Sequence, residues 1–193
     1  MSKIRLYGAT SGYVDLAAPD VAPDGVLTLP ATGALGGLVA VQSALFTGTQ
    51  SASVTTGDNL SVTDLSITHE VADAANKLVI SLTVLGATSK NDGTVGIAVH
   101  DGTSLIGVGD AAGSRVPVTV GGKTTTSSFN RIVNSLSATF VHTPGSGSKT
   151  YTARLVNVTD ATYTLYVNRH TLDADDALSP RGASSLVIQE VSV

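Results

Sequence analysis

Apolar and polar residues alternate along most of this chain with a period of two. The segment 77–86 (KLVISLTVLG) has aliphatic residues at alternate positions, with hydroxyl side chains between them. Its aliphatic positions are Leu78, Ile80, Leu82 and Val84. The segments 94–99 and 162–167 repeat the alternation. Successive side chains of a strand point to opposite faces, so this pattern predicts strands with one buried face.

Turn-forming residues separate these apolar runs. The separators are KNDG at 90–93, HDGT at 100–103, GDAAGS at 109–114, VGGK at 120–123 and TPGSGSK at 143–149. Gly and Asn favour tight turns because they tolerate a positive φ. Helix competes with strand or loop only at 127–137, where the Thr-rich flanks favour strand or loop. Short strands at this spacing predict an all-β fold, an antiparallel jelly-roll sandwich.

The first forty residues differ from the rest. Their short apolar runs are interrupted by Gly8, Gly12, Pro19, Pro23 and Pro30, and small residues fill 30–38. Strand periodicity continues from there to the end of the chain. We therefore predict an extended N-terminal segment, residues 1–40, followed by a β domain, residues 41–193.

Composition and charge exclude several classes of function. Hydrophobic residues make up 42% of the 193 residues and charged residues 13%, against about 25% charged in typical soluble domains. The net charge of −4 gives no basic surface for nucleic acid or an anionic membrane. Without cysteine there are no disulfides and no thiol catalysis. No apolar run approaches the ~20 residues of a spanning helix, so we expect a soluble, uncleaved chain without membrane insertion.

Residues able to carry chemistry are scattered. The four histidines have no partners at metal-ligand spacing, and we expect them to be exposed or in turns rather than on a metal. They are His69, His100, His142 and His170. The acidic stretch 173–176 lacks the spacing of a calcium loop, the glycines at 107–113 do not fit a dinucleotide fingerprint, and no serine lies in a Gly-x-Ser-x-Gly elbow. Paired carboxylates remain open, but there is no tryptophan to stack a sugar. We expect no enzyme activity and no cofactor.

The N-terminal segment resembles the start of many tailed-bacteriophage fibre and virion-surface proteins. The likeness lies in GATSGYV at 8–14 and LTLP at 27–30, followed by GALGGLVAVQ. Two later stretches, 76–115 and 162–191, resemble the terminal domain of the same proteins. They contain DG-T-x-x-IGVGD and Y-x-N-R…RGASSLVIQE, which are similar to trimeric phage domains of the tumour-necrosis-factor and complement jelly-roll type.

The resemblance implies that residues 1–40 attach the protein to a virion. Short extended runs could add as strands to the sheet edge of another chain. Alternatively, the segment folds back on its own domain. The residues that we assign to virion attachment are Tyr7, Gly8, Thr10, Ser11, Gly12, Tyr13, Val14, Leu27, Leu29 and Pro30.

The resemblance also implies a homotrimer, which the low charge content supports. Interfaces favour aromatic over charged residues, so apolar residues could line the threefold contact. The candidates are Tyr151, Leu155, Tyr163 and Tyr166. The alternative for each of them is an ordinary place in the core.

The chain has no heptads, collagen triplets or long repeats to form the shaft of a fibre. We therefore expect a non-enzymatic capsid decoration or cement protein on the virion surface, assembled in the host cytoplasm. Its partners would be itself and other virion proteins, above all the major capsid protein. The alternative is a short tail fibre or spike whose jelly-roll head binds a host surface receptor. A tail enzyme that degrades glycans would need a carboxylate-lined cleft.

Three residues near the C-terminus are predicted to organise a structural loop. Arg169 and Arg181 flank the acidic stretch 173–176, so a guanidinium could clamp a carboxylate and fix the loop. The alternative is solvated charges that contribute at most about 1 kcal/mol. Gly182 precedes the last apolar run and is expected to have a positive φ or a close backbone neighbour.

Overall fold

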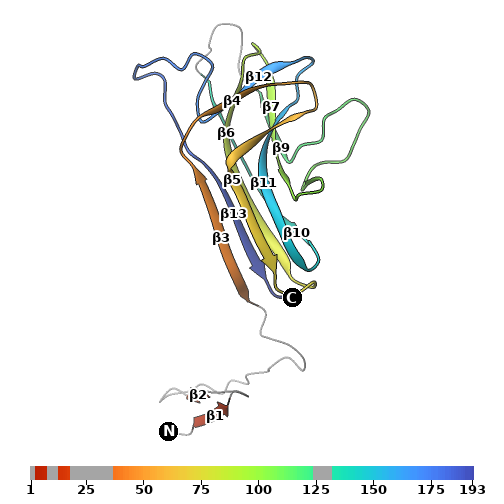
Figure 1. Cartoon of the computed structure of the whole chain (residues 1–193), viewed down its shortest axis with the longest axis vertical. Helices are drawn as coiled ribbons and strands as arrows, with labels where there is room; N and C mark the ends of the chain where they lie inside the picture. Colours follow the sequence, from red (N-terminus) through yellow and green to blue (C-terminus); the bar gives the residue numbers. More distant parts are fainter. Residues whose placement is uncertain (1–2, 8–12, 18–36, 124–131) are drawn as a thin grey trace, which may run out of the picture. The chain divides into compact units, whose positions relative to one another are not determined.

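The computed structural model describes residues 3–7, 13–17, 37–123 and 132–193, and in these ranges every regular element is a β-strand (Figure 1). The chain divides into two compact units, Met1–Leu35 and Gly36–Val193. The predicted boundary at residue 40 falls inside a strand that begins at Leu38. No helix in the described part of the chain is long and apolar enough to cross a membrane.

Two antiparallel sheets form the β domain. The first sheet contains β3 (Leu38–Phe46), β13 (Ser184–Val191), β6 (Lys77–Thr88), β12 (Tyr163–Val167) and β4 (Gln50–Val54) in that order, with β10 (Asn134–His142) also paired to β6. The second contains β5 (Asn59–Val71), β11 (Gly147–Asn157) and β7 (Thr94–His100), with β8 (Leu105–Ile106) and β9 (Val120–Lys123) paired to β7. The predicted all-β antiparallel sandwich is confirmed, and its arrangement is jelly-roll-like.

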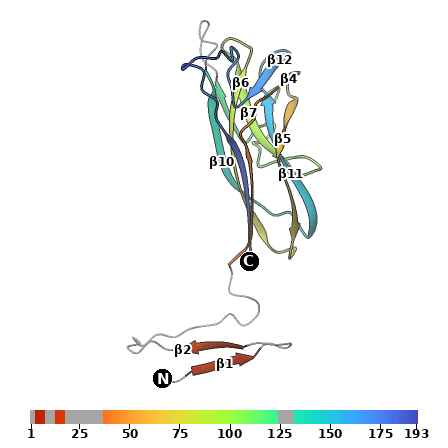
Figure 2. The ribbon, with the colours of Figure 1, turned by 60° about the vertical axis from the view of Figure 1, so that its left-hand side comes forward.

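The two sheets lie against each other (Figure 2), and side chains from both form one core. Most connections cross from one sheet to the other, as between β5 and β6 or between β10 and β11. The alternate aliphatic residues of β6 are buried, as the sequence pattern predicts: Leu78, Ile80, Leu82 and Val84 are each at most 1% exposed. Residues 134–137 of the ambiguous segment 127–137 lie in β10, and residues 127–131 lie outside the described residues.

The turn at 90–93 closes in a different way from the one expected. Asp92 has the positive φ, at 62°, while Gly93 is not among the positive-φ glycines. The amide of Gly93 donates to the carbonyl of Lys90. In the next turn the glycine does take this role, because Gly102 has φ 94°. Asp tolerates the left-handed region better than most residues, which explains why Asp92, and not Gly93, has the positive φ in this turn.

The N-terminal unit contains a β-hairpin. Strands β1 (Lys3–Tyr7) and β2 (Tyr13–Ala17) pair antiparallel, with Tyr7 opposite Tyr13 and Lys3 opposite Ala17. The two strands form a sheet of their own. An isolated two-stranded sheet is marginal in water because it has little surface to bury.

Candidate functional site

Three of the ten predicted attachment residues lie in the hairpin. Tyr7 and Tyr13 are register partners, and Val14 lies opposite Leu6. The other seven, Gly8, Thr10, Ser11, Gly12, Leu27, Leu29 and Pro30, lie outside the described residues. Among the described strands, β1 and β2 pair only with each other, so another chain could add a strand at the second edge of each.

Two of the four predicted trimer-interface residues are core residues. Tyr151 and Leu155 are fully buried within the chain, so they have no side-chain surface to offer a second copy. Their place follows from β11, where alternate residues face the opposite sheet. Burial, together with the charge of Asp101, raises the pKa of Tyr151 to about 12, and its buried hydroxyl has no hydrogen-bond partner in the described structure.

Tyr163 and Tyr166 are half-buried, and cations cover their rings. The guanidinium carbon of Arg169 lies 4.5 Å from the ring centroid of Tyr166, and the Lys90 ammonium lies 5.3 Å from that of Tyr163. Such cation–π contacts stabilise a partly exposed aromatic ring. The trimer contact therefore remains a proposal for these two residues, whereas Tyr151 and Leu155 have the place in the core that was the alternative for each of them.

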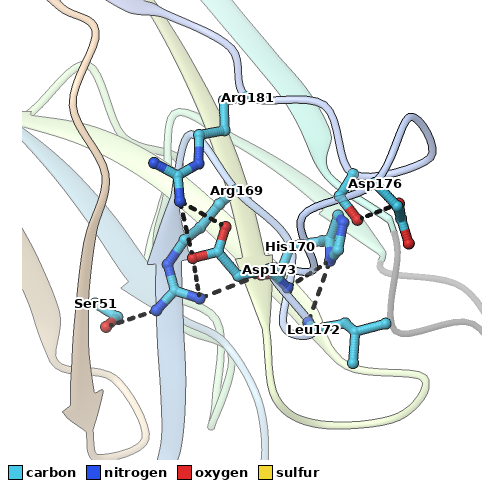
Figure 3. Close-up of polar contacts among 8 residues, drawn as sticks. Ser51, Arg169, His170, Leu172, Asp173, Asp176 and Arg181 are labelled. Carbon is cyan, nitrogen blue, oxygen red and sulfur yellow. Dashed lines mark hydrogen bonds and ion pairs between the residues drawn. The ribbon is translucent and has the colours of Figure 1, made fainter.

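The loop between β12 and β13 contains the predicted arginine–carboxylate contact (Figure 3). Arg181 Nη2 donates to both carboxylate oxygens of Asp173, at 3.2 Å each. Arg169 Nη1 lies 3.6 Å from Asp173 Oδ2, and its Nη2 donates to Ser51 Oγ at 3.1 Å. The Asp173 carboxylate is thus bound by two guanidinium groups. The Arg181 side chain is 62% exposed, which keeps this contact well hydrated.

Hydrogen bonds accepted by the side chains of His170 and Asp176 organise the same loop from within. His170 is buried, and its Nδ1 accepts from the amides of Leu172 and Asp173, at 3.1 and 3.2 Å. Asp173 itself has φ 45°, in the left-handed region. Asp176 accepts from the Leu178 amide at 2.9 Å and from Ser179 Oγ at 2.8 Å. These bonds give the acidic stretch a fixed shape.

Asn168 anchors the start of the loop, although in the sequence it stands out only as part of the Y-x-N-R stretch. It is fully buried with φ 60°. Its Nδ2 donates to the carbonyls of Phe46 and Gly48 at 2.8 and 2.9 Å, and its Oδ1 accepts from Ser184 Oγ at 2.6 Å. The side chain therefore joins the ends of β3, β12 and β13. An asparagine between a strand and a loop is the available signal, because Asn enters the left-handed region readily.

Gly182 was expected to have a positive φ or a close backbone neighbour, and the structure shows the second. It is not among the positive-φ glycines. A Cβ at this position would lie 2.2 Å from Leu85 Cδ2, so the backbone does approach a neighbour closely. Its amide donates to the carbonyl of Asn168 at 3.2 Å, which fixes the loop above β6 two residues before β13 begins.

A buried ionic cluster lies at the opposite end of the sandwich, where β3 begins and β13 ends. We call it the base cluster: Gln42, His69, Asn76 and Glu190, with the amide of Ala72. Glu190 is 1% exposed and accepts from His69 Nε2 at 2.8 Å, Asn76 Nδ2 at 2.7 Å and the Ala72 amide at 2.9 Å. His69 Nδ1 lies 2.9 Å from Gln42 Oε1. Both ring nitrogens thus lie within hydrogen-bond distance of side-chain oxygens, one of Gln42 and one of Glu190.

Two opposing effects act on Glu190. Desolvation acts to raise the pKa of its carboxyl, because burial penalises the charge. The hydrogen bonds from Asn76, His69 and Ala72 together outweigh burial and hold the pKa below its ordinary value of 4.5. A group with a depressed folded-state pKa stabilises the fold above its unfolded-state pKa. That contribution is lost as the pH falls through the folded-state value.

The expectation that the histidines are exposed or in turns is wrong for His69, which is buried in the base cluster, and His170 is buried within its loop. His100 and His142 are half-buried. His100 Nδ1 accepts from the Gly102 amide at 3.1 Å, which places it at a turn. Among the described residues, no three His, Cys, Asp or Glu side chains are grouped closely enough to hold a metal ion.

The outer face of the first sheet carries no charge over three consecutive rows. Register places one residue from each of β3, β13, β6 and β10 in every row. The rows are Val41–Gln189–Val79–Val141, Ser43–Val187–Ser81–Thr139 and Leu45–Ser185–Thr83–Ser137. We call these twelve positions the neutral face. Hydroxyl pairs bridge β6 and β10 within it, Ser81 to Thr139 and Thr83 to Ser137, at 2.9 Å each.

The outer face of the second sheet differs in charge. It has hydroxyl pairs of the same kind, Ser66 to Thr152 at 3.0 Å and Thr68 to Thr150 at 2.9 Å. Charged residues border them: Asp64 and Glu70 on β5 are exposed, and Arg154 on β11 is half-buried. The two outer faces therefore differ in their charged residues, although both contain paired hydroxyl side chains.

The paired sheets and their single core define an all-β sandwich. No family model matches the chain, and none of the curated proteins compared with it does. Two solved structures of infectious bursal disease virus, of the Gx and Gt strains, match 95% and 96% of this chain at 12% and 10% identity. Their TM-scores are 0.42 and 0.39, and the chain spans about half the length of the chains it matches (48% and 47%). The assignment of the fold class rests on the sheets themselves.

Proposed function

We propose that this chain is a non-enzymatic structural protein of a tailed-bacteriophage virion, a homotrimeric decoration or cement protein on the capsid. Residues 1–40 attach it to the particle, and the β domain forms the exposed trimer. Its partners are other copies of itself and other virion proteins, above all the major capsid protein. The proposal places the protein at the virion surface after assembly in the host cytoplasm.

The observation that carries this proposal is the hairpin of β1 and β2. It belongs to a compact unit separate from the β domain, and two strands of five residues cannot bury a core of their own. Its outer edges offer main-chain hydrogen bonds that another chain's sheet can complete. The resemblance of residues 8–14 and 27–30 to phage virion-surface proteins supports the same role.

Particle binding tests the proposal. Residues 37–193 contain the whole described core, so this fragment should fold without the N-terminal unit. We expect the full chain to bind particles stripped of it, and the fragment to bind at least about 100-fold more weakly. A double variant, Leu6→Pro and Val14→Pro, removes one backbone N–H from each strand of the hairpin, either from the ladder between them or from their outer edges, and should bind as weakly as the fragment. Unchanged binding by the fragment would refute attachment through residues 1–40.

A second candidate function is a short tail fibre or spike whose β domain binds a host receptor. The observation in its favour is a pocket of about 350 Å³ beside the organised loop, lined by Leu85, Ile132, Val133, Pro180, Arg181 and Gly182. The pocket is lined mainly by apolar side chains, and Arg181 adds one guanidinium group. The position of the protein on the particle separates the two candidates.

A further inference from the structure

We infer that the neutral face is the surface through which copies of this chain meet. The inference rests on the homotrimer of the proposed function, and it deepens that function by naming the contact surface. It replaces Tyr151 and Leu155, which are buried in the core, with residues that lie on β3, β13, β6 and β10.

Exposure is the first argument. Val41, Leu45 and Val141 are 51%, 65% and 62% exposed. Eight large apolar residues are exposed in the described part of the chain, and three of them are these residues of the neutral face. Leu38 and Val39, at the base end of β3, add two more beside it. Scattered apolar residues are normal on a monomer, but a gathering on one sheet face indicates a contact surface.

The edge strand beside this face supplies the second argument. Strand β3, with sequence LVAVQSALF, contains no charge and no proline, and it pairs only with β13 among the described strands. Monomeric proteins usually protect a long edge strand with lysine, proline or a covering element, because a bare edge recruits other chains. An uncharged edge of nine residues is better explained by a partner that covers it in the assembled protein.

Charge identifies the partner as a second copy. The chain has a net charge of −4, so copies repel one another wherever their charged surfaces meet. The outer face of the second sheet carries Asp64, Glu70 and Arg154, whose charges would lose water or need partners in such a contact. Three neutral faces that converge on the threefold axis of a trimer meet without repulsion and without leaving a charge buried and unpaired. A strongly basic or acidic partner would gain nothing from the neutral face.

The size of the patch sets its role. Strands lie about 4.8 Å apart and successive rows about 7 Å apart, so four strands and three rows span about 14 Å in each direction. An interface of standard size buries about 800 Å² per partner. The neutral face is therefore the centre of the contact, with polar residues around it as the rim.

The test introduces negative charge on the neutral face and compares its effect on assembly with that of negative charge on the outer face of the second sheet. In the full-length chain, Val41→Asp combined with Val141→Asp adds two like charges to an exposed row of the neutral face. Thr68→Asp and Ser66→Asp together are the matched control, because both sites are exposed on the outer face of the second sheet. Circular dichroism and thermal unfolding establish that each variant is folded. Sedimentation velocity over a concentration series then measures assembly.

We expect the wild type and the control to form the same trimer, and the neutral-face variant to need at least a 100-fold higher concentration to assemble. Assembly of a folded neutral-face variant at wild-type concentrations would overturn the inference while leaving the homotrimer of the proposed function intact. Equal weakening by the control would also overturn it. A wild type that stays monomeric at all concentrations would overturn both. Particle binding by the full chain reports on virion attachment separately.

Discussion

The base cluster and the arginine–aspartate contact of the loop are both ionic, but they differ in burial. Glu190 is 1% exposed and accepts three hydrogen bonds, one from His69. The Arg181 side chain is 62% exposed, and among the described residues it forms hydrogen bonds only with Asp173. Removing one partner from a buried pair leaves an uncompensated charge, whereas water replaces the partner of an exposed one. Both sites pair a carboxylate with a nitrogen-bearing side chain, and the difference in their expected energetic weight follows from burial.

The largest effect is expected for Glu190→Gln. This change removes the buried carboxylate that accepts hydrogen bonds from His69, Asn76 and the Ala72 amide, and we expect a loss of about 3–4 kcal/mol in the free energy of unfolding at pH 7. The pKa of Glu190 is lowered in the fold, so its contribution exists above the ordinary value of 4.5 and fades as the pH falls below it. The difference between wild type and variant should therefore shrink in acid. Urea unfolding at two pH values measures this difference. The first is pH 7, and the second is about pH 3.5, roughly one unit below the ordinary pKa of the carboxyl.

Glu70→Gln is the control for that change, because Glu70 is an exposed carboxylate on the same strand as His69. It should alter stability by less than about 0.5 kcal/mol. A difference between Glu190→Gln and wild type that stays constant from pH 7 to pH 3.5 would contradict the assignment of the carboxylate as the stabilising form.

Asn168→Ala is expected to rank second. It removes three hydrogen bonds from a buried position and places alanine at φ 60°. We expect a loss of about 2–3 kcal/mol, measured by thermal unfolding. Asn168→Gly tolerates the φ but loses the same bonds, so it should recover only part of the loss. Complete recovery by glycine would show that the hydrogen bonds to β3 contribute nothing.

Arg181→Ala should have a small effect, because its ion pair is exposed. We expect a loss below about 1 kcal/mol, which corresponds to about 1–3 °C in melting temperature for a chain of this size. The effect should diminish further at 0.5 M salt, where the Debye length is on the order of 4 Å. A loss as large as that of Glu190→Gln would contradict the account of burial given above.

Tyr151→Phe is expected to have the smallest effect and the opposite sign. Its hydroxyl is buried without a partner in the described structure, so removing it abolishes an unsatisfied polar group while keeping the ring. We expect no change or a gain of up to about 1 kcal/mol, again by urea unfolding. A clear loss would indicate that the hydroxyl has a hydrogen-bond partner, such as a bound water.

Much of the fold could be predicted because it is a local property of the sequence. The alternation in 77–86 determines which face of β6 is buried, and the turn residues mark where strands end. The Arg181–Asp173 contact was also accessible, since its members lie eight residues apart. Local pattern likewise explains why Tyr151 and Leu155 were poor interface candidates. In β11 they share one face with Ala153, and that face packs into the core.

The base cluster and the neutral face could not be predicted in this way. His69 and Glu190 are 121 residues apart, and their meeting depends on β5 and β13 belonging to different sheets of one sandwich. The neutral face needs the register of four strands, and no single strand reveals that twelve positions lack charge. Both are products of long-range strand order, which one sequence leaves undetermined.

The location of the protein on the intact particle is the most direct test of the proposed function. Electron cryomicroscopy of virions with and without the protein, or a labelled antibody against the β domain, gives that location. A capsid decoration protein should add density over the capsid shell, with threefold symmetry at each site. Density confined to the tail tip, with none on the shell, would contradict the account and favour a receptor-binding fibre or spike.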